Sequence, residues 1–443
     1  MISLAERVTR STFATVLLAS SGIAHCEDGP FLKWAATHAI PIATLESDVD
    51  FSDLRPLKSA LGTARVVALG EPIHGAHEPL AFRNRMFRFL VEQMGFTAIG
   101  LEWGFTEAIA VNSFTEDSED DVESAAMKHY LGTIEDLQLI RWMQDYNAAA
   151  SSARHRRIRL YGIDLTSGAR RNAPRLAMEY ALTYLSKADP VTAKKIRASV
   201  GDSLPRSDDD EFGPVSTAAL AGYGTSINAI AKAIQTNRNK LIARSSDEEY
   251  RRALHNLDVA HQVARCLPLT PPPSADNSLW GAAHACRDAA MADNVQWALE
   301  NEGPNGRLLV FAHNGHVLNH QWPGSRRSPF KEKASMMGVH LRRVYGNDLY
   351  IISISSVSTS GTLPKPKPIE DSIDDALARV GLPKMFLDLR KARQDSAPFA
   401  WLSQPRPLGA NLGHYDVATP STALDAFVFL RDLSPAGEIY GSD

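Results

Sequence analysis

Short runs of apolar residues recur along the chain, and segments with helical spacing separate most of them. A short apolar run closed by a glycine or a polar residue is typical of a strand that is buried on both faces of a sheet. We expect six such strands, at residues 66–69, 96–101, 159–163, 308–312, 349–357 and 426–430.

The segment after the first strand has a helical pattern. Leu80, Phe87, Leu90, Val91 and Met94 recur at a spacing that places them on one helix face, and Gly95 is a typical helix stop. A second helical stretch is expected around residues 134–146. Strands that alternate with helices predict an α/β fold, with a largely parallel sheet flanked by helices.

The middle of the chain has a different pattern. Between Arg170 and Asn301 there is almost no strand signal, so this region is expected to be a mostly helical insertion or cap. The predicted organisation is therefore a first part of the α/β core at residues 25–169, the insertion at 170–300, and a second part of the core at 301–443.

Residues 1–24 have the layout of a secretory signal peptide. Arg7 and Arg10 precede an apolar stretch, and Gly22-Ile23-Ala24 supplies a small-x-small ending before cleavage. The stretch is shorter than the roughly 20 apolar residues that a membrane span needs, and no other segment is a candidate. We expect export, to the periplasm or the exterior; if residues 1–24 are instead an amphipathic extension, the protein is cytoplasmic.

Composition limits the classes of function. The chain has 443 residues, 44% of them apolar and 22% charged, which is typical of soluble globular proteins. Its 47 basic and 51 acidic residues give a net charge of −4, which argues against a nucleic-acid partner. Three cysteines do not form a disulfide framework, although Cys266 and Cys286 could pair in an oxidising compartment.

Acidic and imidazole side chains follow four of the predicted strands. In open α/β sheets, ligands bind beyond the carboxyl ends of the strands, so these side chains are expected to meet at one edge. They are Glu71 with His74, His77 and Glu78 after the first strand, Glu102 after the second, Asp164 after the third, and His313 and His316 after the fourth.

Each of these residues also has a structural alternative. Glu71 could stabilise the N-terminus of the following helix, Asp164 could belong to a turn, and the histidines could be hydrogen-bonded loop residues. Glu102 is harder to explain in this way, because a carboxylate directly after a buried strand needs a partner.

Arg83 lies on the apolar face of the first helix. A buried guanidinium needs a carboxylate partner, which we expect to be Glu71 or Glu102. The sequence therefore predicts a cluster of Glu71, Glu102, Arg83, His74 and a histidine from the fourth strand.

Several common catalytic motifs are absent. The chain has no GxSxG, P-loop, GxGxxG or HExxH motif. Gly201-Asp202-Ser203-Leu204 spells the GDSL signature of another esterase class, but it follows a helical stretch and we interpret it as chance. The histidines and glutamates have the residue types of a metal site, for which their spacing alone is weak evidence.

The chain resembles the erythromycin esterase family. The resemblance depends on motifs whose order and spacing hold from about residue 31 to 435. These are GEPIHGAHE (70–78) followed by Arg83, GFTAIGLE (95–102), YGIDL (161–165), RDAAMADN (287–294), AHNGHV (312–317) and MGVHL (337–341).

The resemblance implies an esterase that opens a macrolide lactone by hydrolysis. It assigns the activation of water to His74 and the other active-site positions to Glu71, Arg83, Glu102, His313 and His316. A neutral histidine can act as general base, a carboxylate such as Glu71 or Glu102 can orient it, and Arg83 or a second histidine can stabilise the oxyanion.

Two alternatives have different mechanisms. In a metal-dependent hydrolase, the same His/Glu cluster would bind a divalent ion that lowers the pKa of its water. In a non-enzymatic protein, the cleft would bind a ligand without turnover. Our expectation is a hydrolase with no cofactor, although a divalent metal is an alternative, that acts on a small-molecule ester or lactone.

Overall fold

The computed structural model describes residues 29–117, 132–150, 156–166, 173–205, 215–271, 280–322, 334–365, 369–411 and 414–439. The predicted leader at residues 1–24 lies outside these ranges.

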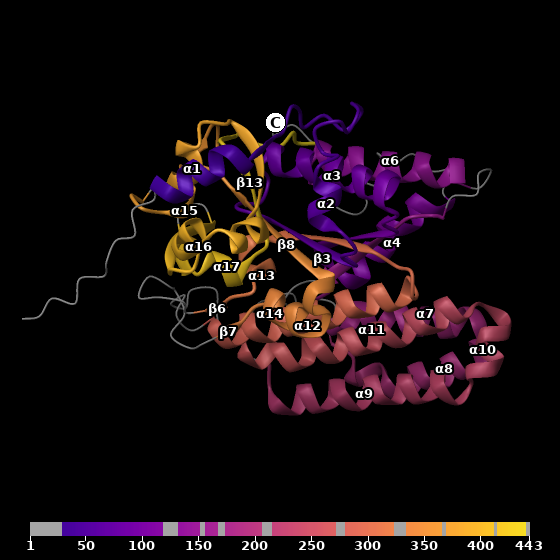
Figure 1. The fold of residues 1–443 in the computed structure, drawn as a ribbon. Helices are drawn as coiled ribbons and strands as arrows, with labels where there is room; N and C mark the ends of the chain where they lie inside the picture. The colour runs from indigo at the N-terminus through magenta and orange to yellow at the C-terminus, as the bar shows by residue number, and fades with distance from the viewer. Residues whose placement is uncertain are drawn as a thin grey trace, which may run out of the picture.

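A sheet of eight strands forms the centre of the molecule (Figure 1), in the order β1-β10-β13-β8-β2-β5-β3-β4. The strands from β13 to β4 pair in parallel, whereas β10 and β1 continue the sheet in antiparallel fashion. The predicted largely parallel sheet is confirmed. The strands are β1 (Ile40–Pro41), β2 (Val66–Glu71), β3 (Ala98–Gly104), β4 (Arg159–Asp164), β5 (Leu308–His313), β8 (Leu349–Ser355), β10 (Lys384–Asp388) and β13 (Ala426–Leu430).

Both faces of the sheet are covered, which explains the continuous apolar runs. Val67 and Leu69 of β2 pack into a core on one face, with residues of α3 (His77–Met94) and α6 (Ile134–Ala150). Val66 and Ala68 point into a second core on the other face, with residues of α12 (Gly281–Asn301) and α14 (Met337–Tyr345). Adjacent residues of a strand point to opposite faces, so a strand between two cores must be apolar throughout.

Helix α3 forms as its sequence predicts. The apolar residues of the predicted face are buried or partly buried, and the helix ends at Gly95, whose φ of 71° is in the left-handed region that favours glycine. Two arginines of this helix, Arg83 and Arg85, are also buried.

A group of helices follows β4. They are α7 (Ala173–Ala188), α8 (Pro190–Val200), α9 (Thr217–Thr236), α10 (Arg238–Arg244) and α11 (Asp247–Cys266), and with α12 they account for the regular structure of the described residues from 173 to 301, apart from short 3-10 turns. They share a core of their own that includes Leu182, Ile227 and Leu257. In Figure 1 this group lies across the sheet from α3 and α6. The mostly helical insertion is confirmed.

The remaining elements connect or flank the sheet. The helices among them are α1 (Gly29–His38), α2 (Leu57–Leu61), α4 (Phe105–Asp117), α13 (Asn314–Val317), α15 (Ile373–Arg379), α16 (Ser396–Leu402) and α17 (Pro420–Ala423). Three two-stranded sheets pair β6 (Gln321–Trp322) with β7 (Ala334–Ser335), β9 (Ser358–Thr359) with β14 (Asp432–Leu433), and β11 (Arg406–Asn411) with β12 (His414–Ala418).

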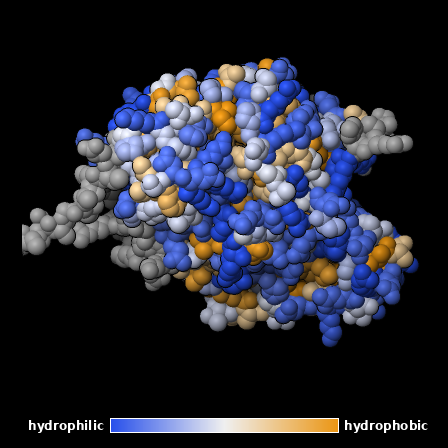
Figure 2. All heavy atoms as spheres, in the orientation of Figure 1, coloured by the Kyte–Doolittle hydropathy of each residue, from blue (hydrophilic) through white to orange (hydrophobic). Residues whose placement is uncertain are grey.

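The face of the molecule drawn in Figure 2 is mostly hydrophilic, with apolar residues scattered among polar ones. Within the described ranges, each helix is too short or too polar to cross a membrane.

Candidate active site

Four neighbouring parallel strands bring the predicted side chains to one edge of the sheet. The strands β2, β5, β3 and β4 are adjacent in that order. Glu71 ends β2 directly opposite His313, which ends β5, and Asp164 at the end of β4 lies opposite Gly104 at the end of β3. Glu102 lies two residues before that end. The expected meeting of these residues at the carboxyl ends of the strands is therefore observed.

Glu71 and His74 form a hydrogen-bonded pair. The distance from His74 Nδ1 to Glu71 Oε1 is 2.7 Å, and His74 is in the turn between β2 and α3. The Glu71 side chain is 6% exposed and that of His74 is 64% exposed. The hydrogen bond with Glu71 raises the pKa of His74, and burial raises the pKa of Glu71. With a proton on Nδ1 held by Glu71, Nε2 of the neutral ring is left as an acceptor.

The ring of His313 lies next to this pair, with its centroid 5.3 Å from that of His74. Its Nδ1 accepts a hydrogen bond of 3.2 Å from the Gly315 backbone N–H. Burial lowers the pKa of His313 to about 3, and the charge of a protonated His74 acts in the same direction. His313 is therefore neutral at physiological pH.

Glu102 is the centre of a second cluster. Its carboxylate accepts hydrogen bonds from the His313 backbone N–H at 2.7 Å and from Arg287 Nη2 at 2.8 Å. The Nε2 atom of His316 lies 3.2 Å from Oε1 of the same carboxylate. Burial alone would raise the pKa of Glu102, but the charges of His316 and Arg287 outweigh it and hold this pKa well below its usual value.

Arg287 of α12 connects two strand ends. It donates to both oxygens of Asp164, from Nε at 2.8 Å and from Nη2 at 2.6 Å, and Nη2 also donates to Glu102. A planar guanidinium suits this arrangement because it can donate to two carboxylates in fixed directions. Asp164 thus has an ionic partner at the site, beyond its hydrogen bond to the Leu165 backbone N–H.

His316 lies between two carboxylates. Its Nδ1 is 2.8 Å from Asp288 Oδ1, and Asp288 also accepts from the Met337 backbone N–H at 2.7 Å. Burial would lower the pKa of His316, but the charges of Asp288 and Glu102 raise it to about 10. His316 is therefore protonated at neutral pH and donates from both ring nitrogens. Arg287 Nη1 lies 3.1 Å from His316 Nε2. Because both nitrogens then carry hydrogens, this is a contact between two donors and not a hydrogen bond.

Close packing places α13, which carries His316, and the end of β5, which carries His313, against β2. A Cβ atom on Gly70 would lie 2.3 Å from Asn314 Oδ1, and one on Gly338 of α14 would lie 2.0 Å from the Val317 carbonyl oxygen. Asn314 is fully buried and donates to the Ile354 carbonyl at 2.8 Å. Two glycines and one asparagine of the sequence motifs thus fix the position of the segment that carries His313 and His316.

The predicted ion pair of Arg83 with Glu71 or Glu102 was wrong. Arg83 is buried, but its Nη1 donates to Asp136 of α6 at 2.8 Å, and its Nε and Nη2 donate to Asn84. The guanidinium also lies 5.1 Å from the centroid of the Phe311 ring. A carboxylate from a helix that lies next to α3 satisfies the arginine, so its effect on the site is limited to its charge, which lowers the pKa of Glu71.

His77 and Glu78 form contacts outside the cluster. His77 Nδ1 is 2.5 Å from Glu135 Oε1, and Glu78 accepts from the backbone N–H and the hydroxyl of Ser434, both at 2.7 Å. These contacts attach the start of α3 to α6 and to the C-terminal segment. The GDSL residues lie at the end of α8 in the helical insertion, where Gly201–Ser203 form a 3-10 turn.

Arg287 and Asp288 were not among the predicted site residues. Asp288 begins a stripe on α12 that continues with Met291, Val295 and Leu299, all of them buried. A charged residue on an apolar helix face needs a buried partner. This reasoning identified Arg83, and the same reasoning applied to α12 identifies Asp288.

Within the described ranges, no three or more His, Cys, Asp and Glu side chains are arranged to hold a metal ion. Buried carboxylate oxygens without a hydrogen-bond partner do occur at the site, on Glu71 (Oε2) and Asp288 (Oδ2). These atoms could accept from a bound ligand or water.

A family model and named relatives identify the family of this chain. The family model described as erythromycin esterase matches residues 91–433, a range that contains Glu102, His313 and His316. The erythromycin esterase type II of Escherichia coli is 24% identical over 396 residues, which cover 82% of this chain and 90% of that protein. A putative hydrolase of Bacillus subtilis, YbfO, is 24% identical over 411 residues, 87% of each chain.

Solved structures show the same fold. A protein of Bacillus cereus has a TM-score of 0.76 at 23% identity, covering 93% of this chain and 98% of that one. A mutant of the erythromycin esterase EreC in its open conformation has a TM-score of 0.63 at 18% identity, covering 89% and 97%. The names of the relatives support a hydrolase, and since the family model covers most of the sequence, the chain belongs to the erythromycin esterase family.

Proposed function

We propose that the protein hydrolyses an ester or a macrolide lactone with a water molecule that His74 activates. The observation that supports this most is the pairing of the buried Glu71 carboxylate with a largely exposed His74 ring at the strand ends. This is the geometry of a general base and the group that orients it. It needs no covalent nucleophile, in agreement with the missing GxSxG motif.

The proposed reaction has two steps. His74 Nε2 takes a proton from water as the water oxygen bonds to the carbonyl carbon, which converts the carbonyl oxygen into an oxyanion. The intermediate then collapses, the bond to the alkoxy oxygen breaks, and that oxygen takes the proton from His74. A linear ester gives an acid and an alcohol, whereas a lactone gives one hydroxy acid. Glu71 stabilises the imidazolium between the two steps.

The second cluster contains two cations, which three carboxylates hold in place. His316 is protonated and Arg287 is always charged, and both are held by the Glu102 carboxylate at the same sheet edge. We propose that they stabilise the developing oxyanion, the role that the sequence assigned to Arg83 or a second histidine. Fixed donors of this kind contribute roughly 10²–10³-fold to the rate in other enzymes.

The macrolide is proposed as substrate from the relatives that are named erythromycin esterases. The direct test is mass spectrometry of erythromycin after incubation with the purified protein, with and without a chelator, alongside His74→Ala. A product heavier by one water that needs His74 and survives chelation is the expected result. Loss of the product on chelation, with recovery on adding a divalent metal, would favour the metal-dependent alternative.

A panel of other esters and lactones separates the remaining outcomes. Turnover of a different ester that also needs His74 would support the proposed hydrolase activity and would show that the macrolide is not the substrate. If erythromycin binds without any product and no ester in the panel is cleaved, the protein is a binding protein and the proposed hydrolysis is wrong.

We also propose that the protein is exported. The layout of residues 1–24 supports this, and so does the disulfide between Cys266 and Cys286, because such bonds persist in oxidising compartments. N-terminal sequencing of the protein from the exported fraction of its native host should begin at His25. Recovery of the intact Met1 form from the cytoplasm alone would contradict the proposal.

A further inference from the structure

A disulfide bond lies next to the residues that organise the second cluster. Cys266 is the last residue of α11, and Cys286 is near the start of α12, with 5.6 Å between their Cα atoms. Cys286 directly precedes Arg287, which binds Asp164 and Glu102, and Asp288, which binds His316. The bond therefore attaches the turn of α12 that carries Arg287 and Asp288 to the end of α11.

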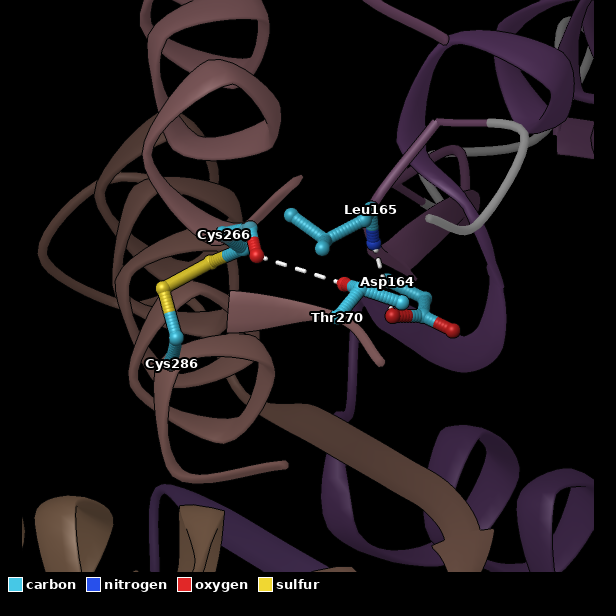
Figure 3. The surroundings of a disulfide bond; sticks show 5 residues. All are labelled: Asp164, Leu165, Cys266, Thr270 and Cys286. Carbon is cyan, nitrogen blue, oxygen red and sulfur yellow. Dashed lines mark hydrogen bonds between the residues drawn. A yellow bond between two sulfur atoms is a disulfide. The ribbon is translucent and has the colours of Figure 1, made fainter. Parts of the chain in front are cut away.

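The same bond also contacts the strand side of the cluster. Cys266 and Cys286 belong to a small apolar group that includes Leu165, and the Leu165 backbone N–H donates to Asp164 Oδ1 at 2.7 Å. Thr270 donates from its hydroxyl to the Cys266 carbonyl at 3.2 Å, and Figure 3 draws it with Asp164 and Leu165 near the disulfide. The disulfide thus supports both partners of the Asp164–Arg287 ion pair. Arg287 follows Cys286 in the chain, and Asp164 precedes Leu165, which packs in the same apolar group as the cysteines.

The two halves of α12 are held in different ways. Asn294, further along the helix, donates to the Ile163 carbonyl at 3.1 Å and accepts from Gln262 at 3.2 Å, so this half is anchored to β4 and α11 by buried hydrogen bonds. The first turn lacks a side-chain cap at Trp280. The turns that carry Arg287 and Asp288 are held by their own ion pairs, by the hydrogen bond from the Met337 backbone N–H to Asp288, and by the disulfide.

We propose that the Cys266–Cys286 disulfide is a positioning element of the active site, so that its reduction lowers hydrolytic activity while the chain stays folded. This inference rests on the proposed hydrolase function. The inference implies that the enzyme reaches its full hydrolytic activity only in compartments where the disulfide persists.

The redox step needs a thiol reductant. Cys266 is buried and Cys286 is partly exposed, so a dithiol attacks the sulfur of Cys286 through its thiolate. The Cys266–Cys286 bond breaks and a mixed disulfide forms. The second thiol of the reagent then displaces Cys286, which leaves two protein thiols and the oxidised cyclic reagent. Two electrons and two protons pass to the protein, and oxidation reverses the step.

The first test compares kcat and the pH profile of kcat/KM before and after reduction with dithiothreitol. A Cys26→Ser background ensures that thiols counted after reduction come from the pair. We expect reduction to lower kcat about tenfold or more, because misplacement of catalytic groups by about 1 Å can cost up to 10²-fold. The acid limb of the pH profile, which the titration of His74 sets, should also move to higher pH, because His74 loses the neighbouring His316 charge that lowers its pKa. Reoxidation should restore both.

The matched control is the double variant Cys266→Ser, Cys286→Ser in the same background. It should have the activity of the reduced enzyme and should not respond to dithiothreitol. Wild-type kcat and an unmoved pH profile in the reduced enzyme would overturn the proposal. So would loss of the helical circular dichroism signal on reduction, since the bond would then be needed for folding rather than for positioning.

A measurement without substrate separates this inference from the proposed function. In the oxidised protein, NMR titration should show that the His316 ring stays protonated up to about pH 10. In the reduced protein this pKa should move towards that of a free imidazole, because Asp288 leaves its place. An unchanged His316 titration would overturn the inference even if esters are cleaved, and a shifted one would support it even if none is. The charged and titratable groups that face His316 are Asp288, Arg287 and His284 on α12, Glu102 on β3, and the neighbouring His74 and His313.

Discussion

Two histidines at the same sheet edge differ in almost every physical respect. His74 is in a turn, its side chain is 64% exposed, and it is hydrogen-bonded to Glu71. The side chain of His316 is 10% exposed and lies between Asp288 and Glu102. Both have a raised pKa, but the shift is to about 10 for His316, whose two carboxylate neighbours outweigh its burial.

The difference assigns different chemistry to the same residue type. A histidine that stays protonated to about pH 10 cannot accept a proton from water at neutral pH, but it provides a fixed positive charge. A histidine that is accessible and paired with a single carboxylate can exchange protons. The site therefore combines one residue that titrates with a cluster that does not, and the predictions below test this division.

Loss of the base should have the largest effect. His74→Ala should lower kcat/KM by roughly 10²–10⁴-fold, the usual contribution of general base catalysis, while the chain stays folded because the side chain is largely exposed. The matched control is His77→Ala, which removes a partly exposed histidine of the same segment that binds Glu135. Steady-state kinetics on the same ester should show near wild-type activity for the control. Equal losses in both variants would remove the distinction between the two histidines.

Glu102→Gln should have the next largest effect. The amide cannot accept from the His313 backbone, Arg287 and His316 as the carboxylate does, so the two cations lose their common partner. We expect kcat to fall by about 10²–10³-fold, as when fixed donors of an oxyanion site are removed. Glu78→Gln makes the same substitution at a glutamate that binds Ser434, and it should leave kcat unchanged. Wild-type turnover by a folded Glu102→Gln variant would exclude Glu102 from the mechanism.

Much of this site could be predicted because it is built on strands. Glu71, Glu102, Asp164 and His313 each come at or near the end of an apolar run, and parallel strands place these ends at one edge. Their hydrogen-bond partners could not be predicted in the same way.

The partners come from helices, whose position relative to the sheet is not contained in the local pattern. Arg287 and Asp288 come from α12, more than a hundred residues from Asp164, and Asp136 of α6 takes the place expected for Glu71 or Glu102 beside Arg83. Strand β10 was missed because its apolar run, Met385–Leu387, is short.

The Glu71–His74 pair predicts a change in pH dependence. Because the hydrogen bond with Glu71 raises the pKa of His74, activity should fall on acidification at a pH above the 6.5 of a free histidine. In Glu71→Gln the raising interaction is lost, so the acid limb of kcat/KM should move to lower pH while kcat falls about tenfold. A limb that moves to higher pH, or stays in place, would mean that His74 is not the group that titrates.

The last and smallest expected effect is that of His316 on the free energy of unfolding, measured from one pH unit to the next. Its folded pKa of about 10 lies above the unfolded value of 6.5, so its stabilising contribution is complete below pH 6.5 and is lost as pH rises through 10. Within that window the free energy of unfolding should fall by about 1.4 kcal/mol per pH unit from this group alone. Urea unfolding at pH 7, 8 and 9 measures the slope, and His316→Gln should lack this part of it. If both proteins have the same slope, His316 is not protonated in the folded state, and the site has two titrating histidines instead of one.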